Sequence, residues 1–209
     1  MNNIDIILDY LDELFPNPVC ELNYNLDYEL LIAVVLSAQT TDKKVNKVTD
    51  ILFSKYPNLE SLKDSDINEL MEILKPLGMY QKKALFVKNI ADKLLDKYDG
   101  KVINNREYLE SLSGVGRKTT NVVLSVLFNE PLIAVDTHVL RVSKRLGLTN
   151  DKDNVLVVEK KLTKLINKER HSKSHYQLVL FGRYYCMALK PKCDSCKLKE
   201  ICKYKKKLN

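Results

Sequence analysis

Long apolar runs, glycine and proline are all scarce in this sequence. The longest uninterrupted apolar run covers residues 30–36, whereas a membrane-spanning helix needs about 18 such residues. Only 6 Gly and 6 Pro occur among 209 residues, of which 45% are hydrophobic. This composition excludes collagen-like, low-complexity and mostly disordered chains. A chain of this length can form one domain or two small ones, with a sizeable core.

Targeting signals are also missing from the start of the chain. Residues 1–13 carry acids where a secretory signal would have a basic segment and an apolar core. The first 42 residues contain no Lys or Arg, which argues against a mitochondrial presequence. We therefore expect a cytoplasmic protein.

Positive charge is concentrated after this acidic start. The formal net charge is +7, and residues 1–42 contain eight acids, so the remainder carries +15. The last thirteen residues hold six Lys and one Glu. Such asymmetry favours a polyanionic partner, with nucleic acid first and an anionic membrane surface second. A lysine-rich solvated surface is the alternative.

Apolar residues recur with the helical period of 3.6 along most of the chain, which predicts an all-α protein. The first helix ends before Pro16, and Asp27 is expected to cap a buried helix over residues 30–38. The region of Pro131 is the expected domain boundary, and the N-terminal helix could pack on either side of it. The other predicted helices cover residues 45–52, 67–74, 84–95, 122–128, 139–146, 155–166 and 177–189.

The segment 112–119, Leu-Ser-Gly-Val-Gly-Arg-Lys-Thr, has the pattern of a helix-hairpin-helix. Gly114 and Gly116 allow a tight turn with positive φ. The N–H groups at the start of the next helix could then bind a phosphate of a DNA backbone, which contributes no sequence specificity. An ordinary turn between two helices is the alternative interpretation.

Lys118 lies in the first turn of this predicted helix, where the helix dipole disfavours a cation. Partial burial beside Val122 would further favour the neutral amine, which can form a Schiff base. The alternative is a phosphate-binding lysine like its neighbour Arg117. Asp136 precedes another helix and is expected to cap it, but a carboxylate near Lys118 could also stabilise a developing cation or transfer protons. We expect His138 to be a hydrogen-bonded structural residue.

Four of the five cysteines, Cys186, Cys193, Cys196 and Cys202, have the spacing C-x6-C-x2-C-x5-C. Four thiolates at this spacing can bind a zinc ion or an iron–sulfur cubane, and spacing leaves both open. Cys20 stands apart and is expected to be a small buried hydrophobe. The lysines within the loop could bind phosphates; they are Lys190, Lys192, Lys197 and Lys199.

Taken together, these motifs resemble the endonuclease III family, which are DNA glycosylases and abasic-site lyases of the helix-hairpin-helix superfamily. The resemblance also rests on residues 36–42 (Leu-Ser-Ala-Gln-Thr-Thr-Asp), 78–80 (Gly-Met-Tyr) and 135–138 (Val-Asp-Thr-His), and it covers essentially the whole chain. It implies a six-helix barrel over about residues 20–130, with the hairpin at about 106–125. Residues 1–19 and 131–209 would form a [4Fe–4S] cluster domain, with the DNA groove between the two domains.

The resemblance also implies a role for individual residues. Lys118 would attack C1′ of a flipped-out nucleotide, with Asp136 as the catalytic carboxylate, and β-elimination would cut the strand 3′ to the lesion. Gln39 would fill the gap left by the extruded base, and Met79 stands where the family usually has a Leu wedge. Ser113 replaces a frequent Pro. The four clustered cysteines would hold the [4Fe–4S] cluster. The implied DNA contacts are Gln39, Thr40, Asp42, Met79, Gly114, Gly116, Arg117, Thr119, His138 and Lys190.

Two other functions fit the motifs. One is a monofunctional mismatch glycosylase for adenine or thymine, and the other is a non-catalytic, metal-containing DNA-binding protein. Lys118 together with four cluster cysteines favours an enzyme that removes oxidised pyrimidines. The expected partner is double-stranded DNA with a damaged base or an abasic site, bound by a monomer.

Overall fold

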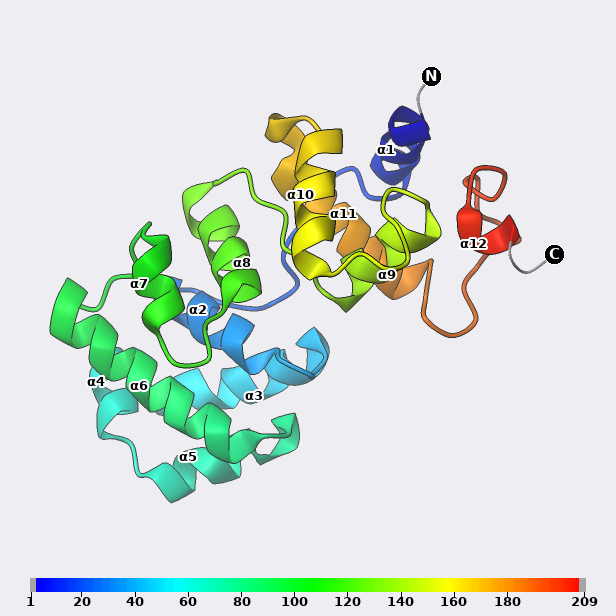
Figure 1. Cartoon of the computed structure of the whole chain (residues 1–209). Helices are drawn as coiled ribbons and strands as arrows, with labels where there is room; N and C mark the ends of the chain where they lie inside the picture. Colours follow the sequence, from blue (N-terminus) through cyan, green and yellow to red (C-terminus); the bar gives the residue numbers. More distant parts are fainter. Residues whose placement is uncertain (1–2, 207–209) are drawn as a thin grey trace. The chain divides into compact units, whose positions relative to one another are not determined.

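The computed structural model describes residues 3–206, so the final residues of the lysine-rich end lie outside the described part. Residues 3–206 form helices and connecting segments with no strand, which confirms the all-α prediction (Figure 1). No helix in this range has the length and apolarity required to cross a bilayer. The chain divides into two compact units, which we call the middle unit (residues 21–128) and the split unit (residues 1–20 and 129–209).

The middle unit surrounds one fully buried helix. Every residue of α2 from Tyr28 to Leu36 is buried, as its all-round apolar pattern predicted. This helix packs against α8, α3 and α6. The helices of the unit are α2 (Asp27–Leu36), α3 (Asp42–Lys55), α4 (Leu59–Asp64), α5 (Ile67–Leu74), α6 (Tyr80–Tyr98), α7 (Arg106–Ser111) and α8 (Arg117–Phe128), with a 3-10 turn at Lys75–Leu77.

The prediction that Asp27 caps this helix is wrong. Leu26 is the N-cap residue and Asp27 is the first helical residue. The carboxylate of Glu29 instead accepts hydrogen bonds from the backbone N–H groups of Asn25 (2.6 Å) and Leu26 (3.2 Å). A buried carboxylate therefore satisfies N–H groups next to the helix start.

The split unit brings the N-terminal helix together with the C-terminal part of the chain. Its helices are α1 (Asn3–Leu14), α9 (Thr137–Arg145), α10 (Val155–Leu165), α11 (His171–Tyr184) and α12 (Lys203–Lys206), with a 3-10 turn at Lys168–Arg170. They share a core in which Leu11, Val139, Leu162 and Phe181 are each at most 1% exposed.

Asp12 joins α1 to α11 through polar contacts. Its carboxylate accepts hydrogen bonds from Arg170 and Gln177, each at 2.8 Å, and pairs with Lys173 at 2.7 Å. Burial alone would raise the pKa of Asp12, but these donors outweigh it and lower the pKa to about 2. The carboxylate is therefore charged at neutral pH and holds α1 to this unit.

Two further predictions about the fold are wrong, and one helix was not predicted. The helix predicted at 177–189 runs from His171 to Tyr184 instead, because the chain turns after Tyr185. The turn is closed by Cys186 N–H, which donates to the Phe181 carbonyl at 2.7 Å. Helix α4 was not predicted, because six residues are too few to show a period. Cys20 is half-buried rather than buried.

Candidate functional site

Helices α7 and α8 are joined by a tight turn over residues 112–116. Val115 N–H donates to the Leu112 carbonyl at 3.1 Å, and Thr120 N–H donates to the Gly116 carbonyl at 2.9 Å. Gly114 has φ +79°, and a Cβ placed there would lie 2.5 Å from the ring of Phe86 on α6. Gly116 does not use the positive φ that glycine allows, and a Cβ there would meet nothing within 4 Å. Only Gly114 is therefore required for the turn itself.

A polar brace that sequence analysis missed fixes α7 against α8. The guanidinium of Arg106 donates to the Asn121 side-chain oxygen at 2.8 Å, and Asn121 is 1% exposed. Asn121 lies on the same helix as the buried Val122 and Val123. A polar residue on this apolar face was the signal that could have revealed the brace.

Lys118 lies in the first turn of α8 and is exposed, as is Arg117, while Thr119 is half-buried. The predicted partial burial of Lys118 is therefore wrong. The buried face of α8 begins two residues later, at Thr120. The structure thus presents the amine at the surface, directly after the hairpin turn and near N–H groups that have no acceptor within the helix.

Asp136, in the split unit, is the N-cap of α9, as predicted. Its carboxylate accepts a hydrogen bond from Val139 N–H at 2.8 Å. The preceding residues, Ile133 to Val135, are buried and fix the position of Asp136, which is itself half-buried. His138 is hydrogen-bonded through Nδ1 to the guanidinium of Arg141 (3.2 Å), which confirms the structural role expected for it.

Gln39 and Met79 each occupy a left-handed backbone conformation in an exposed loop of the middle unit. Their φ values are 56° and 47°, and Met79 is 48% exposed. The hydroxyl of Thr40 donates to the Leu77 carbonyl at 2.7 Å and so joins the two loops. Asp42 begins α3, where the helix dipole favours a carboxylate.

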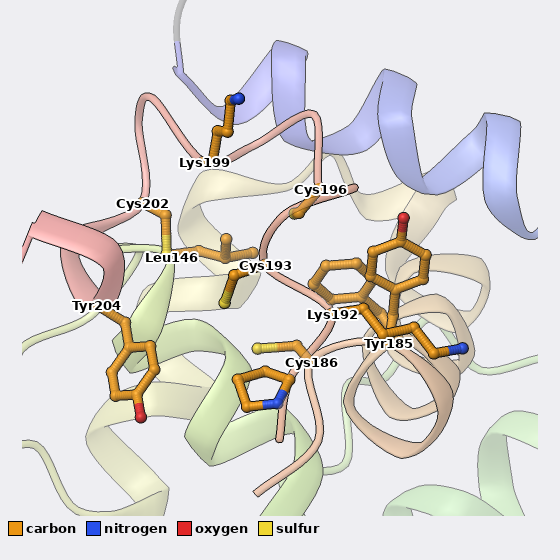
Figure 2. Close-up of a pocket in the computed structure, with 11 residues that line it drawn as sticks. Leu146, Tyr185, Cys186, Lys192, Cys193, Cys196, Lys199, Cys202 and Tyr204 are labelled. Atoms are coloured by element: carbon orange, nitrogen blue, oxygen red, sulfur yellow. The ribbon is translucent and has the colours of Figure 1, made fainter. Parts of the chain in front are cut away.

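The four clustered cysteines line one pocket of the split unit, together with Leu146, Phe181 and Tyr204 (Figure 2). Burial raises the pKa of the Cys186 and Cys196 thiols, and an N–H from Arg145 partly offsets this at Cys186. Among residues 3–206, no group of three or more His, Cys, Asp or Glu side chains has the arrangement for holding a metal ion. By chemistry, although not by their present arrangement, the four thiols around a largely apolar pocket suit an iron–sulfur cluster or zinc.

Two arginines that sequence analysis did not single out hold the backbone on either side of Cys186. Arg141 and Arg145 are four residues apart on α9 and so share one face. Arg141 donates to the Gly182 carbonyl at 2.7 Å, and Arg145 donates to the Met187 carbonyl at 2.7 Å and to Cys186 Sγ at 3.4 Å. These bonds support the backbone from which Cys186 projects.

The lysines of the cysteine loop differ in their surroundings. Lys197 pairs with Glu13 on α1 (2.7 Å to Oε2), so its charge is already compensated. Lys192 lies 5.6 Å from the centre of the Tyr185 ring. Lys190 is exposed and has φ 51°, which turns the chain toward Pro191 and Cys193. An exposed cation in this loop remains available to a phosphate.

Comparison with known proteins identifies this arrangement. The family model described as "HhH-GPD superfamily base excision DNA repair protein" matches residues 32–168. Endonuclease III of Bacillus subtilis (strain 168) is 45% identical over 97% of this chain and 93% of its own length. Endonuclease III of Escherichia coli (strain K12) is 42% identical over 97% of this chain and 96% of its own. A solved structure of a trapped endonuclease III–DNA covalent intermediate (estranged-adenine complex) superposes with a TM-score of 0.94 at 47% identity, and the match covers 100% of this chain and 99% of that one.

The fold and the hairpin are thus those of the HhH-GPD superfamily of base-excision repair proteins. Within it, the chain belongs to the endonuclease III family and is a DNA glycosylase of base-excision repair.

The two hairpin glycines should respond differently to alanine. Gly114→Ala places a methyl group against the Phe86 ring at positive φ, so we expect a loss of about 1–3 kcal/mol in the free energy of unfolding. Gly116→Ala meets open space and should change that free energy by about 0.5 kcal/mol or less.

DNA affinity provides the second readout for this pair. The methyl group of Gly116→Ala stands at the N-terminus of α8, where we expect a phosphate, so binding should weaken while stability is kept. Denaturant unfolding and duplex titration measure the two effects. Equal losses of stability in both variants would contradict the assignment of separate roles.

Proposed function

We propose that this enzyme removes oxidised pyrimidines from double-stranded DNA and then cleaves the strand 3′ to the abasic site. Lys118 is the nucleophile and Asp136 the assisting carboxylate. The observation that carries the proposal is the exposed amine of Lys118 in the first turn of α8, after the glycine turn. It is supported by the family, whose members combine glycosylase and lyase activity.

In the proposed reaction, the amine nitrogen of Lys118 attacks C1′ of the damaged nucleotide and the bond from C1′ to the base breaks. The departing base takes up the proton that the attacking nitrogen loses, and the sugar ring opens as the C1′–O4′ bond breaks, which leaves a Schiff base with Lys118. Loss of a proton from C2′ then expels the 3′ phosphate, which cuts the strand. Water releases the lysine by hydrolysis of the imine. Each step uses groups present in the enzyme, the DNA or water.

Asp136 would act through its negative charge. Its carboxylate faces the N-terminus of α9, and one oxygen accepts the Val139 N–H. A carboxylate can stabilise the positive charge that develops on the sugar as the base leaves, and it can also accept or return protons. Capping fixes the rotamer of the side chain, so the structural and chemical roles support each other.

The remaining DNA contacts divide by chemistry. Gln39 and Met79 are exposed residues on adjoining loops and would occupy the base stack at the lesion, one as a polar filler and one as an apolar wedge. Backbone phosphates would be bound around the hairpin and the cysteine loop. The proposed phosphate contacts are Gly114, Gly116, Arg117, Thr119 and Lys190. Further proposed DNA contacts are Thr40, Asp42 and His138.

We also propose that Cys186, Cys193, Cys196 and Cys202 hold a [4Fe–4S] cluster. The pocket they line is mostly apolar, and Arg145 donates an N–H to one of the sulfurs, a contact that stabilises a thiolate. The cluster would join the two ends of the 186–202 segment and so present Lys190 to DNA. No chemical step passes through it.

Lys118→Ala should abolish strand cleavage and slow base release by about 10³-fold or more, because the covalent nucleophile is lost. DNA binding should change little, since the amine is not a main phosphate contact. Arg117→Ala is the matched control on the same turn of α8. It should weaken binding, reduce its salt dependence and retain cleavage at saturating enzyme. Loss of binding in Lys118→Ala would indicate a phosphate contact instead.

Asp136→Asn separates the two roles of this residue. Asn caps helices as well as Asp does, so the free energy of unfolding should change by about 0.5 kcal/mol or less. Base release should slow by about 10²-fold, because the charge is gone. Asp136→Ala should lose the cap as well, at a cost of about 1 kcal/mol. If Asp136→Asn released the base at the wild-type rate in single-turnover assays, Asp136 would have the capping role alone.

Iron content tests the cofactor. The purified protein should be brown and contain about four iron atoms per chain, as one cubane requires. Cys193→Ser should lose the iron, whereas Cys20→Ser, which changes the lone cysteine, should keep it. A colourless protein with one zinc ion per chain would contradict the cluster.

A further inference from the structure

The loops that carry Gln39 and Met79 are held in uncommon backbone conformations. Only five non-glycine residues among the described ones have positive φ, and two of them are Gln39 and Met79. Such a conformation costs on the order of 1–2 kcal/mol per residue. Surrounding contacts must therefore fix it.

Those contacts converge on Lys83, a side chain buried beneath both loops. Lys83 is 1% exposed. Its Nζ donates to the carbonyls of Ala38 (2.9 Å) and Leu77 (3.0 Å) and to the hydroxyl of Thr40 (3.2 Å). Ala38 and Thr40 flank Gln39 directly, and Leu77 lies two residues before Met79. One ammonium group with three protons thus satisfies three acceptors from two loops.

The three partners of Lys83 are neutral, so the ammonium is buried without a counter-charge. Burial, and then the charge of Lys44, lower its pKa. A buried charge is a poor source of stability, because well-packed apolar side chains usually perform as well or better. What the ammonium adds is geometry, since only a polar group can bind both loop carbonyls at once.

We propose that Lys83 is a positioning residue, whose buried ammonium joins the loops at 37–40 and 77–79 so that Gln39 and Met79 enter the duplex as one preformed unit. The inference rests on the proposed function, in which these two residues occupy the base stack. Opening a stack costs a few kcal/mol. If the two loops are already ordered before binding, no conformational entropy of the loops is lost in addition to the free energy of opening the stack.

This role predicts which reaction step depends on Lys83. Base release requires the damaged base to leave the stack. Cleavage at a preformed abasic site does not, because no base is there to displace. Loss of the ammonium should therefore slow base release far more than it slows cleavage of an abasic duplex.

The test compares Lys83→Met with Lys88→Met. Lys88 lies on the same helix and also donates to two carbonyls, those of Lys63 (2.7 Å) and Ser65 at the C-terminal end of α4. That segment carries neither Gln39 nor Met79. Lys83→Met should slow single-turnover base release from a thymine-glycol duplex by about 10- to 100-fold. Cleavage of a preformed abasic duplex should change by about threefold or less, and Lys88→Met should alter neither rate.

The fluorescence of a base analogue gives a second readout, which a general loss of protein stability would not change. With 2-aminopurine beside the lesion, wild type and Lys88→Met should unstack the probe on binding, and Lys83→Met should unstack it less at equal occupancy. If Lys83→Met does not fold, Lys83→Gln, which keeps a donor of shorter reach, takes its place.

The inference is overturned if base release and abasic cleavage fall by the same factor, or if Lys88→Met shows the same selective loss. Failure of the proposed function looks different. In that case the wild-type enzyme itself does not cleave the abasic duplex, while unstacking of the probe still reports on Lys83.

Discussion

The close approach of the hairpin turn to α6 is the constraint on which the middle unit depends. Gly114 lies against the ring of Phe86 with φ +79°, where any side chain would clash with that ring. The turn sets where α8 begins, and the Arg106–Asn121 bond fixes α8 against α7. Because α8 begins at this turn, Lys118 lies at the surface, next to the N–H groups of the first turn of the helix. One contact between a glycine and an aromatic ring thus fixes the proposed nucleophile and phosphate site.

A similar arrangement occurs in both units, where a buried or half-buried cation donates hydrogen bonds to backbone carbonyls near residues of the proposed sites. Lys83 holds the loops of Gln39 and Met79, while Arg141 and Arg145 bind backbone carbonyls on either side of Cys186. Exposed loops are the mobile parts of most proteins. Here Gln39 and Met79, which are proposed to contact DNA, lie on loops whose carbonyls accept hydrogen bonds from a buried side chain. This lowers the conformational entropy that the loops lose on binding.

Local patterns were enough to predict the helical fold, the buried α2 and the Asp136 cap, because each depends on residues near in sequence. The long-range contacts of Lys83, Arg141 and Arg145 could not be predicted. Lys83 binds Ala38, 45 residues away, and nothing in a helical period says which lysine points inward. The exposure of Lys118 was missed because its burial depends on where the covered face of α8 begins. The early end of α11 was missed because the turn at Cys186 interrupts an apolar pattern that continues beyond it.

The most direct test of the account is to locate the covalent bond. The wild-type enzyme is reacted with a thymine-glycol duplex under borohydride, the adduct is digested, and the modified peptide is identified by mass spectrometry. The account predicts the reduced sugar adduct on Lys118. An adduct on any other amine, or release of base with no adduct at all, would contradict it.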